Sequence, residues 1–400
     1  MRHHWAILTG EYPPQCGGVG DYTAQLASRL AQCDQDVTVI TPSLGEDSSR
    51  SNSGVRILRI PRAFHLPGLD RTERILRQLR PDRLLVPYTP HAFGRKAMNL
   101  PLAYYLRRWG QSIAPLWVIF HEVAFPFSSH KIRYMILAAV THLMARMIAQ
   151  SASRIFVTTG AWDRLLRRVA PRRVASEWLP VPSNLEGVAP VEASLPAGCE
   201  EEVWLGHLGA YGPLAETVLE AAGRELLPQY PRVKMVLLGR GSETLARQWQ
   251  KRGVAWVDRL LVPGVLPAGE LVAWLQRCQV LLQPYPDGVS SRRTSAMAAL
   301  CGGIPLVTNL GPLSEPFWPD RLPYLAAAPR TAELLELAGQ LLGDARRRRE
   351  LALHGQQLYQ ELFCWDCLLT RLLVCNHGLY SPPAHCGTFL RRGAQSPLTP

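Results

Sequence analysis

The chain has 400 residues, which is too long for one ordinary hydrophobic core and predicts two domains, or three. Apolar residues make up 47% of the sequence and charged residues 19%, so disorder is excluded for most of the length. The formal net charge is +12, but the arginines are spread through nearly every predicted helix. This spread argues against nucleic-acid binding and leaves an anionic substrate or an anionic membrane surface as the partner.

The nine cysteines are odd in number and scattered, which predicts reduced thiols and not a disulfide framework. Cys364 and Cys367 form a C-x-x-C pair, but no second pair follows, so no metal site is predicted. No signal segment precedes the first strand, and the apolar stretch 134–145 is too short to span a bilayer. We expect a cytoplasmic protein, with a peripheral place at the inner face of the membrane left open.

Residues 1–182 alternate short apolar runs with helical patterns, which is typical of a parallel sheet covered on both faces. Strands are predicted at 5–9, 37–41, 55–60, 83–86, 116–121 and 154–158. Helices are predicted at 22–32, 71–79, 100–109, 131–150 and 162–168. Right-handed crossovers make this an α/β, doubly wound, Rossmann-like N-terminal domain.

A linker without periodicity is expected at 183–202, and the alternation restarts in a second Rossmann-like domain, 203–345. Its strands are predicted at 203–206, 233–238, 255–257, 280–283 and 304–308. Its helices are predicted at 214–226, 242–252, 268–277, 291–300 and 331–342. Two such domains are expected to face each other across a cleft, with ligands at the carboxyl ends of the strands.

One long helix is predicted over 346–375, and a return of this helix to the first domain is left open. The remaining residues, 376–400, are rich in Pro, Ser and Gly and are expected to be a disordered tail.

The loop 10–22 joins the first strand to the first helix and is the first candidate site. Gly17, Gly18 and Gly20 allow the backbone to approach a ligand closely, and the helix N-terminus behind them favours anions. A plain tight turn is the alternative. Asp21 is either the N-cap of the helix or a carboxylate that orients an acceptor hydroxyl.

His121 and Glu122 end a buried strand, where polar groups are costly unless they face a site. A structural histidine with satisfied hydrogen bonds is the alternative for His121.

The segment 284–297 is a strand, a Pro/Gly turn and a hydroxyl-rich helix start with two arginines. Free amides at Ser290 and Ser291, together with guanidinium groups, are expected to form a diphosphate cradle. An ordinary capped helix with exposed arginines is the alternative. The candidate donor-binding residues of this segment are Asp287, Gly288, Ser290, Ser291, Arg292, Arg293 and Ser295.

In order and spacing, these motifs resemble the family-4 retaining glycosyltransferases of GT-B architecture, over residues 8–373. The resemblance implies that Gly17–Gly20 approaches the donor phosphates and the acceptor, and that His121 contacts the donor sugar. It adds two glycine turns of the second domain to the donor site, namely Gly209, Tyr211 and Gly212, and then Gly239 and Arg240. Retention of configuration and no obligatory metal or other cofactor are also implied.

The chain departs from the family at its donor site. The usual pair of glutamates eight positions apart is replaced, by Ser295 under one alignment and by Ser290 and Ala298 under another. The usual arginine and lysine clamp is also missing, with His207 and Tyr211 nearby instead. We infer that Arg292 and Arg293 neutralise the diphosphate in place of that clamp.

The function expected from the resemblance is sugar transfer from a nucleotide-diphosphate sugar to a glycan or lipid-linked acceptor, as in polysaccharide biosynthesis. A sugar-nucleotide binding protein without turnover is the alternative, because the glutamates are missing. An NAD-dependent oxidoreductase would need a glycine fingerprint that the sequence lacks. Arg107, Arg108 and Trp109 on the helix 100–109 suggest a membrane-facing surface, against the alternative of an ordinary cover helix.

Overall fold

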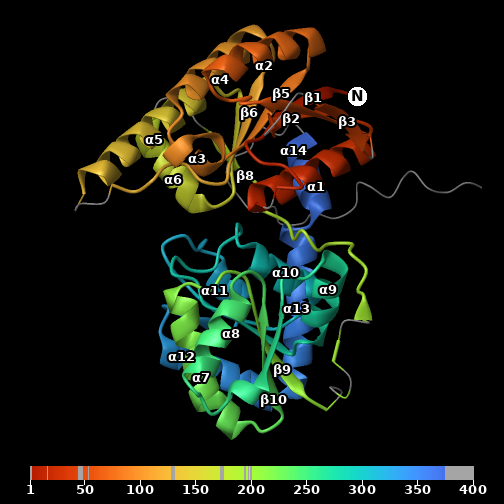
Figure 1. The fold of residues 1–400 in the computed structure, drawn as a ribbon, viewed down its shortest axis with the longest axis vertical. Coiled ribbons are helices and arrows are strands. Elements are labelled where there is room, and N and C mark those ends of the chain that lie inside the picture. The colour runs from red at the N-terminus through yellow and green to blue at the C-terminus, as the bar shows by residue number, and fades with distance from the viewer. Residues whose placement is uncertain are drawn as a thin grey trace, which may run out of the picture. The chain divides into compact units, whose positions relative to one another are not determined.

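The computed structural model describes residues 2–15, 17–43, 48–52, 54–127, 131–171, 175–192, 195–196, 198 and 201–373. The chain divides into two compact units, the first ending at Leu179 and the second running from Pro180 to Leu373 (Figure 1). The predicted tail 376–400 lies outside the described residues.

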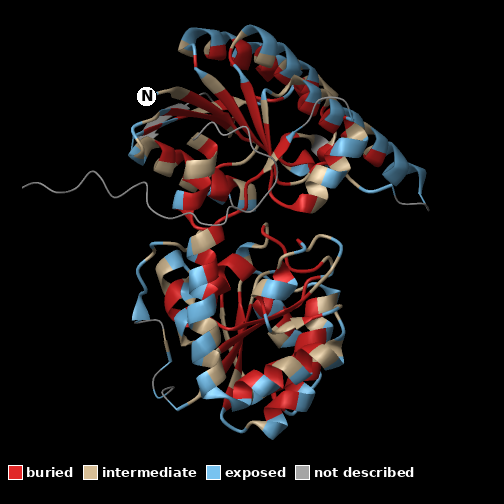
Figure 2. Ribbon diagram, turned by 180° about the vertical axis from the view of Figure 1, so that it is seen from behind, coloured by how far each residue is buried: buried red, intermediate tan, exposed pale blue. Residues whose placement is uncertain are grey.

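The first unit is built on an eight-stranded sheet. Its strands in chain order are β1 (His4–Leu8), β2 (Asp36–Ser43), β3 (Ser48–Asn52), β4 (Val55–Pro61), β5 (Arg83–Tyr88), β6 (Leu116–Phe120), β7 (Arg154–Val157) and β8 (Ser176–Trp178). Their order in the sheet is β3-β4-β2-β1-β5-β6-β7-β8, and β3 alone pairs antiparallel, with β4. Continuous apolar runs such as Leu116–Phe120 are buried along their whole length, because helices cover both faces of the sheet (Figure 2).

The helices of this unit follow the strands as right-handed crossovers require. They are α1 (Gly18–Gln32), α2 (Leu66–Leu79), α3 (Pro90–Phe93), α4 (Leu100–Ser112), α5 (Ile132–Ser151) and α6 (Gly160–Val169), with a short 3-10 turn at Arg95–Ala97. Apolar residues of the strands and of α4, α5 and α6 share one core. Trp109 of α4 is fully buried in it, and Arg108 is paired with Glu73. Helix α4 therefore covers the core with Trp109, which cannot face a membrane, while Arg107 is exposed and the membrane-facing surface of this helix stays a prediction.

The second unit contains a six-stranded, fully parallel sheet. Its strands are β9 (Val203–Leu208), β10 (Val233–Leu238), β11 (Leu260–Gly264), β12 (Val280–Gln283), β13 (Leu306–Asn309) and β14 (Leu325–Ala326). Their order is β11-β10-β9-β12-β13-β14, which is the strand order of a Rossmann sheet. The helices are α7 (Pro213–Gln229), α8 (Ser242–Lys251), α9 (Ala268–Arg277), α10 (Thr294–Gly302), α11 (Trp318–Arg321), α12 (Thr331–Gly343), α13 (Ala345–Leu362) and α14 (Trp365–Leu373).

Two doubly wound α/β domains were expected, and the structure confirms that fold class. One predicted strand, 255–257, is wrong. A 3-10 turn occupies Val257–Arg259, and the strand follows it as β11. Trp256 packs against Trp249 there, and the Arg259 guanidinium donates to the backbone carbonyls of Leu227, Tyr230 and Val233. These contacts hold the chain in a turn, and strand β11 begins directly after it.

The single helix predicted over 346–375 is two helices. Helix α13 ends at Leu362, and α14 begins at Trp365 with the Cys367 amide donating to Cys364 Sγ at 3.4 Å. Both helices pack on the start of the predicted linker, where Ser183 O accepts from Trp365 Nε1 and Glu186 accepts from the Tyr359 hydroxyl. These bonds place residues 183–186 in the second unit.

Candidate functional site

The predicted site residues lie in loops that follow the carboxyl ends of strands. In the first unit the strand order reverses between β1 and β5, and in the second unit it reverses between β9 and β12. Loops beside such a reversal form the ligand crevice of an open parallel sheet. The glycine-rich loop follows β1, and the segment 284–293 follows β12. Each unit therefore has its candidate residues where its topology favours a ligand.

The glycine-rich loop of the first unit already holds a carboxylate. Helix α1 has Gly17 as its N-cap, and Glu11 Oε1 accepts from the amides of Val19 and Gly20, both at 3.1 Å. A Cβ at position 17 would come within 2.2 Å of the Glu11 carboxylate, so a larger residue there would displace the Glu11 side chain from this position. The expectation that this helix N-terminus takes an external anion is corrected, because the chain's own Glu11 occupies these two amides.

Asp21 is not the N-cap of α1. It lies in the first turn with its side chain exposed, and its amide donates to Gly17 O at 2.9 Å. Partial burial, and then the nearby Glu11 carboxylate, raise the pKa of Asp21. The role of Asp21 toward an acceptor hydroxyl remains a prediction.

Three elements fix His121 at the end of β6. Its amide donates to Tyr88 O at 2.9 Å, and its carbonyl accepts from Trp162 Nε1 at 2.8 Å. Its ring meets the edge of the Tyr22 ring at a centroid distance of 4.6 Å, and it is 8% exposed. Burial raises the pKa of both Tyr22 and Tyr88, which keeps these phenols neutral. His121 thus contacts α1 through Tyr22, the residue that follows Asp21.

Glu122 follows His121 and is partly exposed. Its Oε2 accepts from the Thr89 hydroxyl at 3.3 Å, which links the loops after β5 and β6. The structure therefore brings Asp21, His121 and Glu122 to the same edge of the first sheet.

In the second unit the two glycine turns predicted for the donor site pack on each other. Gly209 has φ +142 and Gly239 has φ +101, and a Cβ at Gly239 would lie 2.8 Å from Gly209 O. The Tyr211 hydroxyl donates to Leu238 O at 3.1 Å, while Arg240 is exposed. Gly212 is the N-cap of α7, and within the described part of the chain no side chain caps the first turn of this helix.

His207 lies at the end of β9, beside the first of these turns. Its Nδ1 donates to Leu282 O at 2.9 Å, and its ring centroid is 5.1 Å from that of Tyr211. Burial lowers the pKa of His207, so the imidazole is held neutral at this position. A neutral His207 cannot supply the positive charge of the arginine and lysine that the family resemblance leads one to expect here.

The segment 284–293, which we call the donor loop, is held by the end of β13. The Asn309 side chain accepts from the Tyr285 amide at 2.9 Å and donates to Tyr285 O at 2.8 Å. The Val289 amide donates to Asn309 O at 2.8 Å. Gly288 has φ +84, and a Cβ there would lie 2.2 Å from the Gly311 amide. The donor loop is therefore a fixed structure that depends on glycine at position 288.

The two arginines of the donor loop share one carboxylate. Arg293 donates to Asp287 Oδ1, and Arg292 Nη2 lies 3.7 Å from Asp287 Oδ2. The Arg293 guanidinium also stacks over the Tyr285 ring at 4.8 Å, and the Tyr285 hydroxyl is hydrogen bonded to Ser295 Oγ at 2.8 Å. Asp287 offsets one of the two positive charges, so this group carries one net positive charge and not two.

The helix start predicted at Ser290 and Ser291 is wrong. Helix α10 begins at Thr294 with Arg293 as its N-cap, and the Ser291 amide donates to both carboxylate oxygens of Glu315 at 3.2 Å. Trp318 Nε1 donates to the same carboxylate at 2.6 Å. The Ser291 amide is therefore not available to a phosphate.

Glu315 was not predicted from the sequence. It is 1% exposed, and burial raises the pKa of its carboxyl, against the hydrogen bonds from Ser291 and Trp318. It lies 24 positions after Ser291 in a Pro-rich loop without periodicity, so no local pattern could identify it. The nearest signal is a charged residue three positions before a buried tryptophan.

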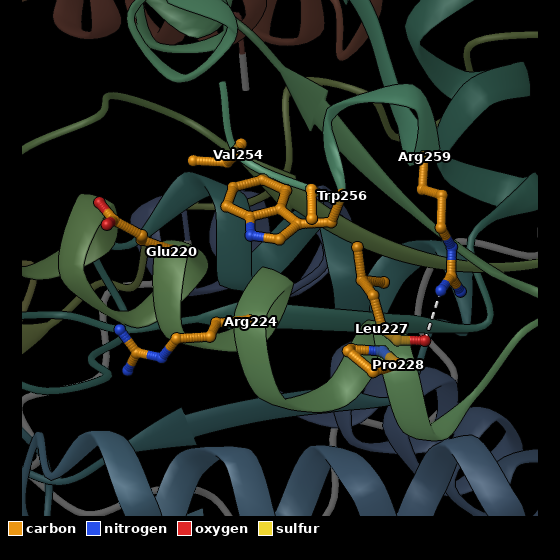
Figure 3. A pocket seen from close by; sticks show the side chains of 8 residues that line it. Glu220, Arg224, Leu227, Pro228, Val254, Trp256 and Arg259 are labelled. Atoms are coloured by element: carbon orange, nitrogen blue, oxygen red, sulfur yellow. Dashed lines mark hydrogen bonds between the residues drawn. The ribbon is translucent and has the colours of Figure 1, made fainter. Parts of the chain in front are cut away.

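A separate hollow of about 470 Å³ lies in the second unit (Figure 3). Its lining comes from the end of α7 and from the segment before β11: Glu220, Arg224, Leu227, Pro228, Val254, Ala255, Trp256 and Arg259. These residues precede β10 and β11, so the hollow is at the amino ends of the strands, opposite the predicted site. Its Arg259 is committed to backbone carbonyls. Within the described residues, no group of three or more His, Cys, Asp or Glu is placed to hold a metal ion.

Part of the first unit is similar to a known protein family. Residues 17–182 match the family described as glycosyl transferase 4-like domain. None of the curated protein sequences compared with this chain matches it.

Solved structures share the fold of the whole chain. HepE of Anabaena, solved with UDP and glucose, is 14% identical with a TM-score of 0.65, covering 93% of this chain and 99% of HepE. WaaG, a glycosyltransferase involved in lipopolysaccharide biosynthesis, is 13% identical with a TM-score of 0.66, covering 94% and 100%. A putative UDP-N-acetylglucosamine 2-epimerase from Listeria monocytogenes is 13% identical with a TM-score of 0.55, covering 88% and 91%. The chain has the GT-B fold of two Rossmann-like domains, and its residues 17–182 are similar to a glycosyl transferase 4-like domain.

Proposed function

We propose that the protein transfers a sugar from a nucleotide-diphosphate sugar to a glycan or lipid-linked acceptor, with retention of anomeric configuration. The observation that carries the proposal is the donor loop, a fixed loop with a net positive charge at the carboxyl end of β12, where the sheet order reverses. The glycosyl transferase 4-like domain and the fold shared with HepE, solved with UDP-glucose, support it.

The chemistry assigned to the donor side is stabilisation of a leaving group. The bond between the anomeric carbon and the diphosphate oxygen breaks, a bond to the acceptor oxygen forms, and the acceptor proton leaves with the nucleoside diphosphate. Negative charge grows on the diphosphate, and Arg292 and Arg293 are placed to stabilise it. The first turn of α7 adds backbone amides and the positive end of a 17-residue helix.

The first unit is assigned to the sugar and acceptor side, following the family resemblance. His121 would contact the donor sugar, and Asp21 and Glu122 would orient the acceptor hydroxyl. The exposed side chain of Asp21 and the fixed position of His121 support these roles. No metal or other cofactor is part of the proposal.

The proposed setting is polysaccharide assembly by a cytoplasmic protein that lies at the inner face of the membrane. WaaG, which shares the fold, is involved in lipopolysaccharide biosynthesis.

A second function, donor binding without turnover, is favoured by one observation. The only carboxylates found at the donor loop, within the described residues, are Asp287 and Glu315, and both are committed to internal partners. Because a fold does not determine a reaction, as the epimerase with the same fold illustrates, the two functions need an experiment.

The test is a thermal-shift screen against UDP-, GDP- and ADP-sugars, followed by an assay of nucleotide release with and without acceptor glycans. The transferase is supported by a donor that raises the melting temperature and yields a glycosylated product. Stabilisation without any product would establish the binding protein instead. No stabilisation by any nucleotide sugar would contradict both.

A further inference from the structure

Helix α5 consists of two halves with different surroundings. Met144, Ala145, Ile148 and Ala149 of its second half belong to the core of the first unit. In its first turns, every residue from Lys131 to Ile136 is exposed, and the helix runs out from the rest of the unit (Figures 1 and 2).

Large apolar side chains gather on this exposed half. Of the eleven exposed large apolar residues among the described part of the chain, six lie between positions 127 and 143: Phe127, Ile132, Tyr134, Met135, Ile136 and Leu143. Ile132 is 73% exposed and Phe127 is 61% exposed. Single exposed apolar residues are ordinary on a soluble protein, but a contiguous group is typical of an interaction surface. We call these six residues, with Lys131 and Arg133, the α5 tip.

The charges of the α5 tip are all positive. Lys131 and Arg133 flank Ile132, and Arg146 is exposed further along the helix. The sequence has no Asp or Glu between Glu122 and Asp163. The Arg133 guanidinium stacks on the Tyr134 ring at 4.8 Å, so charge and apolar surface are interleaved. This pattern complements a layer that has an apolar interior and an anionic outer surface.

The directions in which the exposed side chains point favour lipid over a protein partner. Successive residues of a helix point about 100° apart, so six consecutive exposed residues face all directions. A protein partner covers one side of a helix, whereas lipid can surround it. A second copy packed through the α5 tip would bring Lys131 and Arg133 close to the same basic residues of the partner.

Helix α5 is also long and apolar enough, by length and composition, to cross a membrane. Spanning would require Met144, Ala145, Ile148 and Ala149 to leave the core, with the loss of that packing. We therefore propose that the α5 tip docks on the surface of an anionic lipid bilayer, with Ile132, Met135 and Ile136 inserted among the headgroups. The inference deepens the peripheral membrane position proposed above and rests on it.

The test is co-sedimentation of the full chain with phosphatidylcholine vesicles, without or with about 30 mol% phosphatidylglycerol. The wild type is expected to sediment with the anionic vesicles, and to do so less at high salt. The I132S/M135S/I136S variant and, separately, the K131E/R133E variant are each expected to lower the partition coefficient about tenfold or more.

The matched control is V265S/L353S in the second unit, since Val265 is 72% exposed and Leu353 is 63% exposed. This control should bind the vesicles like the wild type. The donor thermal shift, measured without vesicles, reports whether each variant is folded and keeps the two proposals separable.

Three results would overturn the docking proposal. The wild type stays in the supernatant with anionic vesicles, or both tip variants sediment as well as the wild type. The third result is an oligomer in sedimentation velocity that the tip variants abolish, while neither the wild type nor any variant binds vesicles. A second copy of the chain would then be the partner of the α5 tip.

Discussion

Each unit has a loop and a helix after its first central strand. The two units differ in what accepts hydrogen bonds from the backbone amides at the start of that helix. In the first unit Glu11 accepts from two amides at the start of α1. In the second unit α7 begins after Gly212 with no side chain, among the described residues, hydrogen bonded to its first turn. An internal carboxylate makes an external anion unfavourable at the first helix, whereas the second helix keeps its positive end for a ligand. This difference supports the proposal that a donor diphosphate binds to the second unit.

The largest expected effect is at the donor loop. We expect the R292A/R293A variant to lower kcat/KM about 100-fold, because it removes both guanidinium groups that are proposed to stabilise the leaving diphosphate. The measurement is initial rate against donor concentration. R247A, an exposed arginine of the same unit, should leave the rate unchanged. Equal activity of the double variant and the wild type would end the role proposed for these arginines.

The second prediction tests whether the donor loop of the second unit is rigid. G288A is expected to cost about 1–3 kcal/mol of stability, because a Cβ would meet the Gly311 amide and the φ of +84 is unfavourable for alanine. Donor affinity should fall with it, as measured by urea unfolding and by calorimetric titration. The control is G343A, at an exposed position at the end of α12 where a Cβ would meet no neighbour within 4 Å. A G288A protein as stable as the wild type would show that the loop is not rigid.

The first unit provides the opposite test. E11A should lower the free energy of unfolding by about 1 kcal/mol, because two amides of α1 lose their acceptor. E11Q keeps an acceptor oxygen and should lose less. Donor affinity should be unchanged in both, as measured by titration with the donor found in the screen. If E11A instead gains affinity for the donor, the first helix competes for the diphosphate and the assignment by unit fails.

The smallest expected effect is a pH dependence from Glu315. Its pKa is raised in the folded protein above the ordinary value of 4.5, so the folded state holds the proton to higher pH than the unfolded state does. Stability from this group is therefore greatest below that ordinary value and is lost as pH rises through the raised pKa. The stability of the wild type minus that of E315Q should fall over this window. Urea unfolding at several pH values measures it, and a constant difference would contradict the buried, shifted carboxyl.

Sequence patterns predicted the two doubly wound sheets because buried parallel strands are continuous apolar runs, such as Leu116–Phe120. They missed β3, whose sequence is Ser-Ser-Arg-Ser-Asn, and placed a strand at 255–257, where Trp256 packs as a turn. At the site, the loops were predicted and their internal bonds were not. Glu11 on α1, Asp287 on both arginines and Glu315 on Ser291 are tertiary contacts, and neither propensity nor spacing identifies them.

The most direct test is calorimetric titration of the donor found in the UDP-, GDP- and ADP-sugar screen into the wild type, E11A and R292A/R293A. The account predicts equal affinity for the wild type and E11A, and about a 100-fold loss for R292A/R293A. A gain of donor affinity in E11A, with full binding in R292A/R293A, would place the diphosphate on the first unit and contradict the account.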